Sequence, residues 1–169
     1  MARLLSYRAS AGSGLTGIHL HTETWREPIR EIIKQYGGQF AGKIVVDITN
    51  PLNATYDGLA TPAGSSGAEE LARLQPQAIL VKAFNTIFAG TLASGQVAGQ
   101  KLDVFIAGDD PRARARVSEL ASKGGLNPVE TGPIQTARQL EQLGFLSIAL
   151  QQPLGLGFMS GWKLLKPQS

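Results

Sequence analysis

Apolar residues gather in three short runs that are typical of buried strands. The runs cover residues 44–48, 78–84 and 102–107, and Ile, Val, Leu, Ala and Phe supply most of their positions. Strands that are covered on both faces, as in parallel sheets, read as near-continuous apolar runs of this kind. The first run is broken by one charged residue, Asp47. The pattern predicts three adjacent parallel strands, followed by a short fourth strand at 128–131.

Segments with helical spacing of apolar residues alternate with these strands. The predicted helices cover residues 26–36, 66–74, 110–123 and 133–150. Asp110 is a suitable N-cap for the third helix, and Pro111 suits its first position. Strands alternating with helices indicate right-handed βαβ units. We therefore expect the α/β class, with a three-layer Rossmann-like parallel sheet in one domain over residues 1–169, of which 1–24 are atypical.

The N-terminal segment contains a literal G-x-G-x-x-G, at residues 12–17. This fingerprint binds a dinucleotide only when it lies between a strand and a helix, so that helix N-terminal amides meet the pyrophosphate. Residues 15–22 lack a helical apolar stripe, and His19 and His21 alternate there with apolar residues. We therefore expect no dinucleotide loop here, and a half-exposed strand at 17–22 instead. This strand is an edge of the sheet unless residues 3–8 add as a further strand.

Composition and charge exclude several classes of function. The chain has 169 residues, 43% of them hydrophobic, a formal net charge of +3 and no cysteine. Thiol catalysis and disulfides are thereby excluded. No basic run is interleaved with aromatic residues, so nucleic acid is not an expected partner. No apolar run reaches the roughly 20 residues of a membrane span, and no signal-peptide pattern opens the chain. We expect a cytoplasmic protein without a membrane partner.

Small polar turns follow each predicted strand. They are Thr49-Asn50-Pro51, Asn85-Thr86 and Gly108-Asp109. Ligands of open α/β sheets bind beyond the carboxyl ends of the strands, so these turns are candidates for one site. For Asn50 a plain strand-ending turn is an equal alternative, and for Asn85 the alternative is that it caps the turn after its own strand. The glycine-rich start of a helix at 64–67 could hold an anion, or simply cap that helix.

Five segments, taken together, resemble a known family. They read GKIVVDITNPL at 42–52, GSSGAEEL at 64–71, VKAFNT at 81–86, FIAGDD at 105–110, and GPI followed by A-R-x-L-E at 132–141. In this order they resemble the NADP oxidoreductases that depend on the deazaflavin coenzyme F-420. They are also similar to the reductase domain of STEAP-type metalloreductases. The similarity runs from about residue 25 to residue 165.

The resemblance implies a Rossmann fold and hydride transfer between NADPH and a deazaflavin or flavin-type acceptor. It implies NADP as cofactor, with coenzyme F-420 or a flavin as the second. The implied cofactor-binding residues are Thr49, Asn50, Pro51, Leu52, Ala83, Phe84 and Asn85. No acid, base or metal is implied, because such sites act by positioning donor and acceptor and by excluding water. The glycine-rich segment at 155–162 is expected to shape the pocket of the second cofactor.

One departure from the family leaves a second hypothesis open. Family members begin with a complete mononucleotide-binding half that carries the G-x-G-x-x-G loop, and residues 1–24 do not resemble it. The alternative is therefore a shortened homologue without tight cofactor binding, acting as an interaction module or pseudoenzyme. Without the first half, one strand becomes an open edge that invites pairing with another chain. We expect a homodimer on this ground.

Overall fold

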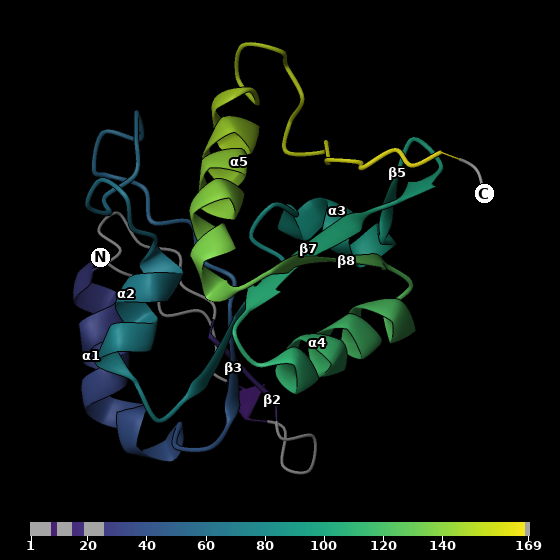
Figure 1. The fold of residues 1–169 in the computed structure, drawn as a ribbon. Coiled ribbons are helices and arrows are strands. Elements are labelled where there is room, and N and C mark those ends of the chain that lie inside the picture. The colour runs from purple at the N-terminus through teal and green to yellow at the C-terminus, as the bar shows by residue number, and fades with distance from the viewer. Residues whose placement is uncertain (1–7, 10–14, 19–25, 168–169) are drawn as a thin grey trace.

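The computed structural model describes residues 8–9, 15–18 and 26–167 and shows one mixed sheet with helices on both faces (Figure 1). The sheet order is β1-β2-β3-β4-β7-β8. Its strands are β1 Arg8–Ala9, β2 Leu15–Ile18, β3 Ile44–Asp47, β4 Ile79–Lys82, β7 Asp103–Gly108 and β8 Asn127–Gly132. A separate small hairpin is formed by β5 Gln96–Val97 and β6 Gln100–Lys101. The α/β class and the four predicted strand positions are confirmed.

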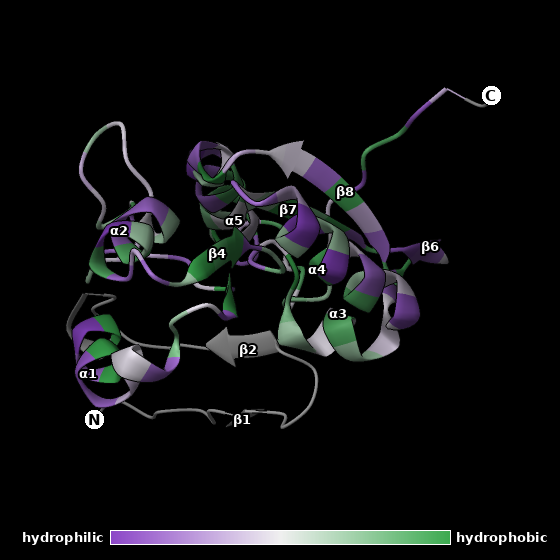
Figure 2. Ribbon diagram, turned by 60° about the horizontal axis from the view of Figure 1, so that its bottom comes forward, coloured by the Kyte–Doolittle hydropathy of each residue, from purple (hydrophilic) through white to green (hydrophobic). Residues whose placement is uncertain are grey.

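The helices are α1 Arg26–Tyr36, α2 Gly67–Leu74, α3 Ala89–Ser94, α4 Pro111–Lys123 and α5 Ala137–Ala149, with 3-10 turns η1 Gly37–Gln39 and η2 Ile134–Thr136. The four predicted helices are confirmed. Two begin at side-chain caps that the sequence contains. The Ser66 hydroxyl accepts from the Glu69 N–H, and the Asp110 carboxylate accepts from the first turn of α4. In Figure 2, α1, α2 and α4 carry both hydrophobic and hydrophilic residues, as helices with one buried face do.

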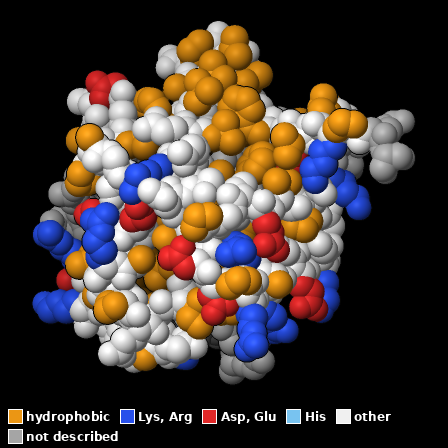
Figure 3. Space-filling view, in the orientation of Figure 1, with side chains coloured by type: hydrophobic (Ala, Val, Ile, Leu, Met, Phe, Trp, Pro, Cys, Tyr) orange, Lys and Arg blue, Asp and Glu red, His pale blue; other side chains and the backbone are white. Residues whose placement is uncertain are grey.

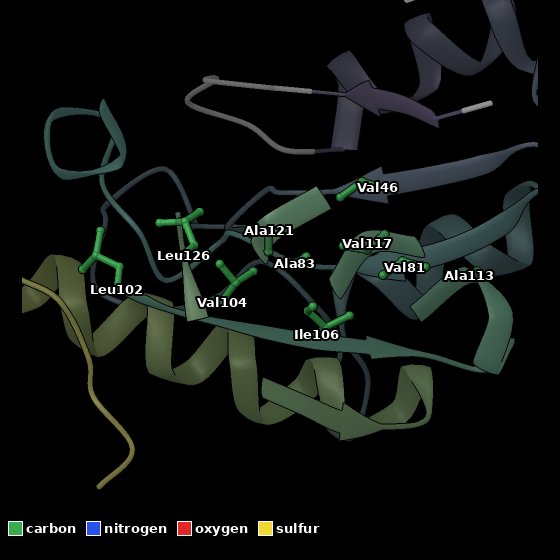
Figure 4. Packing of buried hydrophobic residues seen from close by; sticks show 10 residues of the cluster. All are labelled: Val46, Val81, Ala83, Leu102, Val104, Ile106, Ala113, Val117, Ala121 and Leu126. Carbon is green, nitrogen blue, oxygen red and sulfur yellow. The ribbon is translucent and has the colours of Figure 1, made fainter. Parts of the chain in front are cut away.

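Alternate residues of the central strands point into two separate cores. Val45 and Leu80 pack with α1, α2 and the start of α5. Val46 and Val81 pack with β7 and α4 in the second core, part of which Figure 4 shows. Because strand side chains alternate between the faces of a sheet, this separation puts α4 on the face opposite to α1 and α2. The three-layer arrangement is therefore confirmed.

The expected all-parallel order is wrong at one point. Strand β7 runs antiparallel to β4, with Val81 opposite Gly108 and Lys82 opposite Ala107, whereas β8 is parallel to β7. The segment between β4 and β7 holds only the six-residue α3 and the β5–β6 hairpin. Because β7 is reversed, Asp109 follows it toward the amino end of β4, so the third polar turn does not join the other two.

The expected edge strand at 17–22 is also corrected where the structure describes it. Residues 15–18 form β2, which pairs in parallel with β3 on one side and antiparallel with β1 on the other. Among the described strands β2 is therefore internal, and β1 lies at the end of the sheet. His19 and His21 lie outside the described residues. The last residues of the G-x-G-x-x-G enter a strand and not a helix, in agreement with our expectation that it is no dinucleotide loop.

Candidate functional site

Two asparagines meet at the carboxyl ends of β3 and β4. The two strands are parallel and in register, with Asp47 opposite Lys82, and each asparagine follows three residues later. The Asn50 Nδ2 donates to the Asn85 carbonyl oxygen at 2.8 Å, and the Asn85 Nδ2 donates to the Asn50 Oδ1 at 3.0 Å. The structure therefore brings together the two turns that the sequence placed at one sheet edge. We call this pair the amide pair.

Helix α5 covers the amide pair. The Asn85 Nδ2 also donates to the carbonyl oxygen of Leu140 at 2.8 Å. At Gly144, one turn further along α5, a β-carbon would lie 2.3 Å from the Asn50 Oδ1. Asn85 is 5% exposed, and its buried Oδ1 has no hydrogen-bond partner among the described residues. The hydrogen bonds of Asn85 thus reach across to the turn after β3 and to α5.

The other predicted cofactor residues surround the amide pair with unequal exposure. Thr49, Pro51 and Ala83 are buried, whereas Leu52 and Phe84 are partly exposed to solvent. Phe84 has φ of 64°, in the left-handed region. A bulky side chain is strained there, and such strain gathers at functional sites. The accessible part of this edge is therefore formed by Asn50, Leu52 and Phe84.

A buried charged cluster that the sequence analysis did not identify lies under the amide pair. The Lys82 Nζ donates to the Asp47 Oδ2 at 2.9 Å, to the Glu141 Oε1 at 3.0 Å and to the Thr49 carbonyl oxygen at 2.6 Å. The side chains of Lys82 and Glu141 are 0% exposed, and that of Asp47 is 2% exposed. An ammonium has three N–H donors, and here each has an acceptor. We call Asp47, Lys82 and Glu141 the charged cluster.

The N-terminus of α2 binds a carboxylate from within the chain. The Gly67 N–H donates to the Glu141 Oε2 at 2.8 Å, and the Ala68 N–H donates to the Oε1 at 3.1 Å. Unpaired amides and the helix dipole favour an anion at such a position. Both alternatives that the sequence left open for 64–67 hold in part, because Ser66 caps the helix and an internal anion takes the remaining amides.

Burial and charge act in opposite directions within the charged cluster. Burial raises the pKa of Glu141 above its ordinary value of 4.5, although the Lys82 ammonium pulls it down. Burial alone would lower the pKa of Lys82, but the carboxylates of Asp47 and Glu141 outweigh it and raise that pKa above 10.5. Burial therefore favours the protonated form of Glu141, and the Lys82 ammonium opposes it.

A signal for this cluster was present in the sequence. Each of the first two apolar runs contains a single charge, Asp47 in one and Lys82 in the other. The charges are opposite, and each lies three residues before an asparagine. Since a buried charge needs a partner, two adjacent strands with such charges indicate a cross-strand ion pair. Glu141 gave a weaker signal, as a charged residue within the apolar stripe of its helix.

The segment after α5 lies against α3 and β7 (Figure 1). The Phe158 ring contacts the Phe88 ring edge to face at 5.2 Å, and the Lys163 Nζ donates to the Lys101 carbonyl oxygen at 3.0 Å. Phe88 follows Asn85 by three residues in the chain. Apolar side chains gather over the end of α5 and this segment in the space-filling view (Figure 3). Its expected role in a second cofactor pocket stays a prediction.

The described residues contain no group of three or more His, Cys, Asp or Glu side chains that could hold a metal ion. Within the same residues, no helix combines the length and the apolar character that crossing a bilayer needs.

Comparison with curated proteins finds metalloreductases. The chain is 39% identical over 105 residues to metalloreductase STEAP3 of Rattus norvegicus, a match that covers 62% of this chain and 20% of that protein. It is 32% identical over 102 residues to metalloreductase STEAP2 of Homo sapiens, covering 60% of this chain and 19% of that protein. The chain thus spans about a fifth of the length of these relatives. No family model matches the sequence.

Comparison with solved structures finds a reductase fold. A structure described as an F-420-dependent NADP reductase from Arthrobacter sp. FB24 matches with a TM-score of 0.75 and 32% identity, over 82% of this chain and 64% of that one. A hypothetical protein from Sinorhizobium meliloti matches with a TM-score of 0.57 and 33% identity, over 63% of this chain and 52% of that one. Both resemblances expected from the sequence are therefore confirmed: this chain is similar to the F-420-dependent NADP reductases and to the STEAP metalloreductases.

Proposed function

We propose that this chain binds NADP(H) at the carboxyl ends of β3 and β4 and transfers hydride between NADPH and a deazaflavin or flavin-type acceptor. The observation that carries the proposal is the amide pair. Its asparagines come from the ends of two adjacent parallel strands, which is where open α/β sheets bind ligands. The similarity to an F-420-dependent NADP reductase supports the same cofactor class.

The residues at this edge fit the nicotinamide end of the cofactor. The carboxamide of nicotinamide has both donors and an acceptor, and the Asn85 Oδ1 is an acceptor without a partner among the described residues. The residues proposed to border the nicotinamide are Thr49, Asn50, Pro51, Leu52, Ala83, Phe84 and Asn85. NADPH supplies the hydride when it is bound. The chain contributes orientation and exclusion of water, and no acid or base is required of it.

The pyrophosphate end fits less well, which supports a second candidate function. The amides of Gly67 and Ala68 are occupied by Glu141, so the start of α2 offers them to no phosphate. Residues 15–18 form a strand directly after the first glycines of the G-x-G-x-x-G. A shortened homologue that keeps the sheet without tight cofactor binding, and acts as an interaction module or pseudoenzyme, agrees with these observations.

Calorimetric titration with NADPH and with NADH separates the two candidates. A dissociation constant in the micromolar range for NADPH supports the reductase, and no heat with either cofactor supports the shortened homologue. An informative variant is Phe84→Gly, which removes the ring while glycine accepts the backbone φ of 64°. We expect it to weaken NADPH binding.

The matched control for this titration is Tyr56→Gly. Tyr56 is also an aromatic residue in the left-handed region, with φ of 58°, and its side chain is exposed. This control removes an aromatic ring and relieves the same kind of strain without touching the proposed site. Equal binding by wild type, Phe84→Gly and Tyr56→Gly would place the cofactor elsewhere. A binding-competent protein that fails to reduce both coenzyme F-420 and FMN with NADPH would contradict the proposed acceptor class.

We also propose a homodimer. The described sheet ends at the two-residue strand β1 on one side and at β8 on the other. Open strand edges pair readily with a second chain. Light scattering at several protein concentrations tests this, and a monomer at every concentration would refute it.

A further inference from the structure

The charged cluster is connected to the amide pair through the main chain that directly follows β3. The Lys82 Nζ donates to the Thr49 carbonyl oxygen at 2.6 Å, and the Thr49 N–H donates to the Asp47 Oδ1 at 2.9 Å. Both backbone polar groups of Thr49 are therefore held by cluster side chains. Thr49 directly precedes Asn50, and Pro51 then restricts the backbone of Asn50. The cluster thus fixes the approach of the chain to one member of the amide pair.

A second connection runs through α5. The Glu141 carboxylate is bound by two amides of α2 and by Lys82. The neighbouring residue, Leu140, supplies the carbonyl oxygen that accepts from the Asn85 Nδ2. Any displacement of Glu141 therefore also moves an acceptor of Asn85.

These two connections together determine the orientation of the Asn85 side chain. Its Nδ2 has two hydrogens, which are donated to the Asn50 Oδ1 and to the Leu140 carbonyl oxygen. Each acceptor belongs to a segment that the charged cluster holds. With both hydrogens directed, the Oδ1 can point in only one way, and it is the atom left without a partner. The atom is buried in the ligand-free protein, and its direction decides whether a ligand amide that reaches it finds an acceptor.

The charged cluster is not suited to proton transfer with a substrate. Lys82 and Glu141 are fully buried, and the three donors of Lys82 all have acceptors within the protein. A side chain in this state can act on a ligand only through the groups it holds.

We propose that Lys82 and Glu141 are positioning residues that set the hydrogen bonding of the Asn50–Asn85 amide pair. The consequence for a cofactor rests on the proposed function, but the effect on the amide pair does not. The ligand chemistry concerned is an amide or carboxamide N–H group that needs an acceptor. Loss of the Glu141 charge should therefore change the amide pair, even in the protein without ligand.

The test compares Glu141→Gln with a control that loosens the same two helices. Glu69 on α2 binds Arg138 on α5 through two hydrogen bonds, of 2.8 and 2.6 Å. Glu69→Gln therefore weakens the α2–α5 contact without touching Lys82. The measurement is the ¹H–¹⁵N spectrum of the side-chain amides, with the signals of the pair assigned through Asn50→Ala and Asn85→Ala. We expect Glu141→Gln to shift the Asn50 and Asn85 signals.

Hydrogen exchange supplies a second readout. The Asn85 Nδ2 hydrogens should exchange about tenfold faster in Glu141→Gln, roughly the effect of losing one net hydrogen bond. Glu69→Gln should leave both the shifts and the exchange unchanged. Equal effects of the two variants would reduce Glu141 to a helix-docking residue and overturn the proposal, as would unchanged amide signals in Glu141→Gln.

A substitute variant and a cofactor titration complete the test. Should Glu141→Gln fail to fold, Asp47→Asn replaces it, since it changes the other carboxylate that binds Lys82. NADPH titration of the same variants then tests the consequence. We expect weaker binding for Glu141→Gln and unchanged binding for Glu69→Gln. Absence of NADPH binding in the wild type would refute the proposed function alone, because the spectra of the ligand-free protein still decide the positioning role.

Discussion

Replacing Lys82 with methionine should strongly destabilise the fold. Methionine has similar length and keeps much of the apolar stem packing, but it removes the ammonium between two carboxylates. Asp47 and Glu141, with side chains 2% and 0% exposed, would then be left without their counter-charge. Breaking a buried ion pair by removing one partner costs about 3–5 kcal/mol. This is a large part of the roughly 5–15 kcal/mol that stabilises a typical domain.

The loss can be measured by urea unfolding followed by circular dichroism at pH 7. With a slope of about 2 kcal/mol/M, the midpoint should fall by roughly 1.5–2.5 M. The melting temperature should fall by about 6–20 °C, since 1 kcal/mol corresponds to roughly 2–4 °C in a chain of this size. The triple variant with Asp47→Asn and Glu141→Gln added should recover much of this loss, because the buried charges are then gone. A loss below about 1 kcal/mol for Lys82→Met would refute the reasoning.

The pH dependence of the Lys82→Met variant gives an independent check. Burial raises the pKa of Glu141 above 4.5, and among the groups that pull it down the Lys82 ammonium is the strongest. Without Lys82 this pKa should rise further. A carboxyl whose pKa is higher in the folded state binds more protons there, so stability falls as the pH rises through that pKa. The destabilisation should therefore be smaller at pH 5 than at pH 8. The opposite order would contradict the proposed ionisation of the cluster.

Three further changes have expected outcomes that urea unfolding can check. Glu69→Gln should cost no more than about 1 kcal/mol at pH 7, because the Arg138 partner is partly exposed. Since the hydrogen bond from Arg138 lowers the pKa of Glu69 below 4.5, this contribution is present above pH 4.5 and lost as the pH falls, so the wild type and variant curves should converge in acid. Gly144→Ala should cost about 1–3 kcal/mol, because the new methyl group would lie 2.3 Å from the Asn50 Oδ1. Phe84→Gly should be more stable than Phe84→Ala by about 1 kcal/mol, because glycine accepts the positive φ; equal stability would contradict the strain.

The positions of strands and helices could be predicted from the sequence, but the direction of one strand could not. The runs at 78–84 and 102–107 are apolar because both are buried, and burial is independent of strand direction. Direction is decided by the connection between them. That connection contains a helix signal near 88–93, which a right-handed crossover would also need. The helix proved to be the six-residue α3, and the chain returns through the β5–β6 hairpin, so β7 enters the sheet reversed.

The candidate site was predictable to the extent that it depends on β3 and β4. Asn50 and Asn85 end adjacent parallel strands that the sequence identified, and their meeting follows from the register of those strands. The contribution of α5 was not predictable in this way. Leu140 and Gly144 contact the amide pair because of the way a distant helix packs on the sheet, and no local pattern encodes that packing.

The start of α2 shows that a sequence motif can predict an anion-binding position without telling whether the anion is a ligand or a side chain of the same protein. The glycine-rich residues 64–67 have the features of an anion site, and the structure places an anion there. The anion is the Glu141 carboxylate, some 70 residues later in the chain. The same carboxylate also forms an ion pair with Lys82 beneath the amide pair. An incoming phosphate would have to displace this carboxylate and leave Lys82 with one acceptor fewer. Since burying an ammonium without its partners is costly, we expect the start of α2 to keep its hydrogen bonds to Glu141. A phosphate-bearing cofactor at this edge must then be bound through other groups.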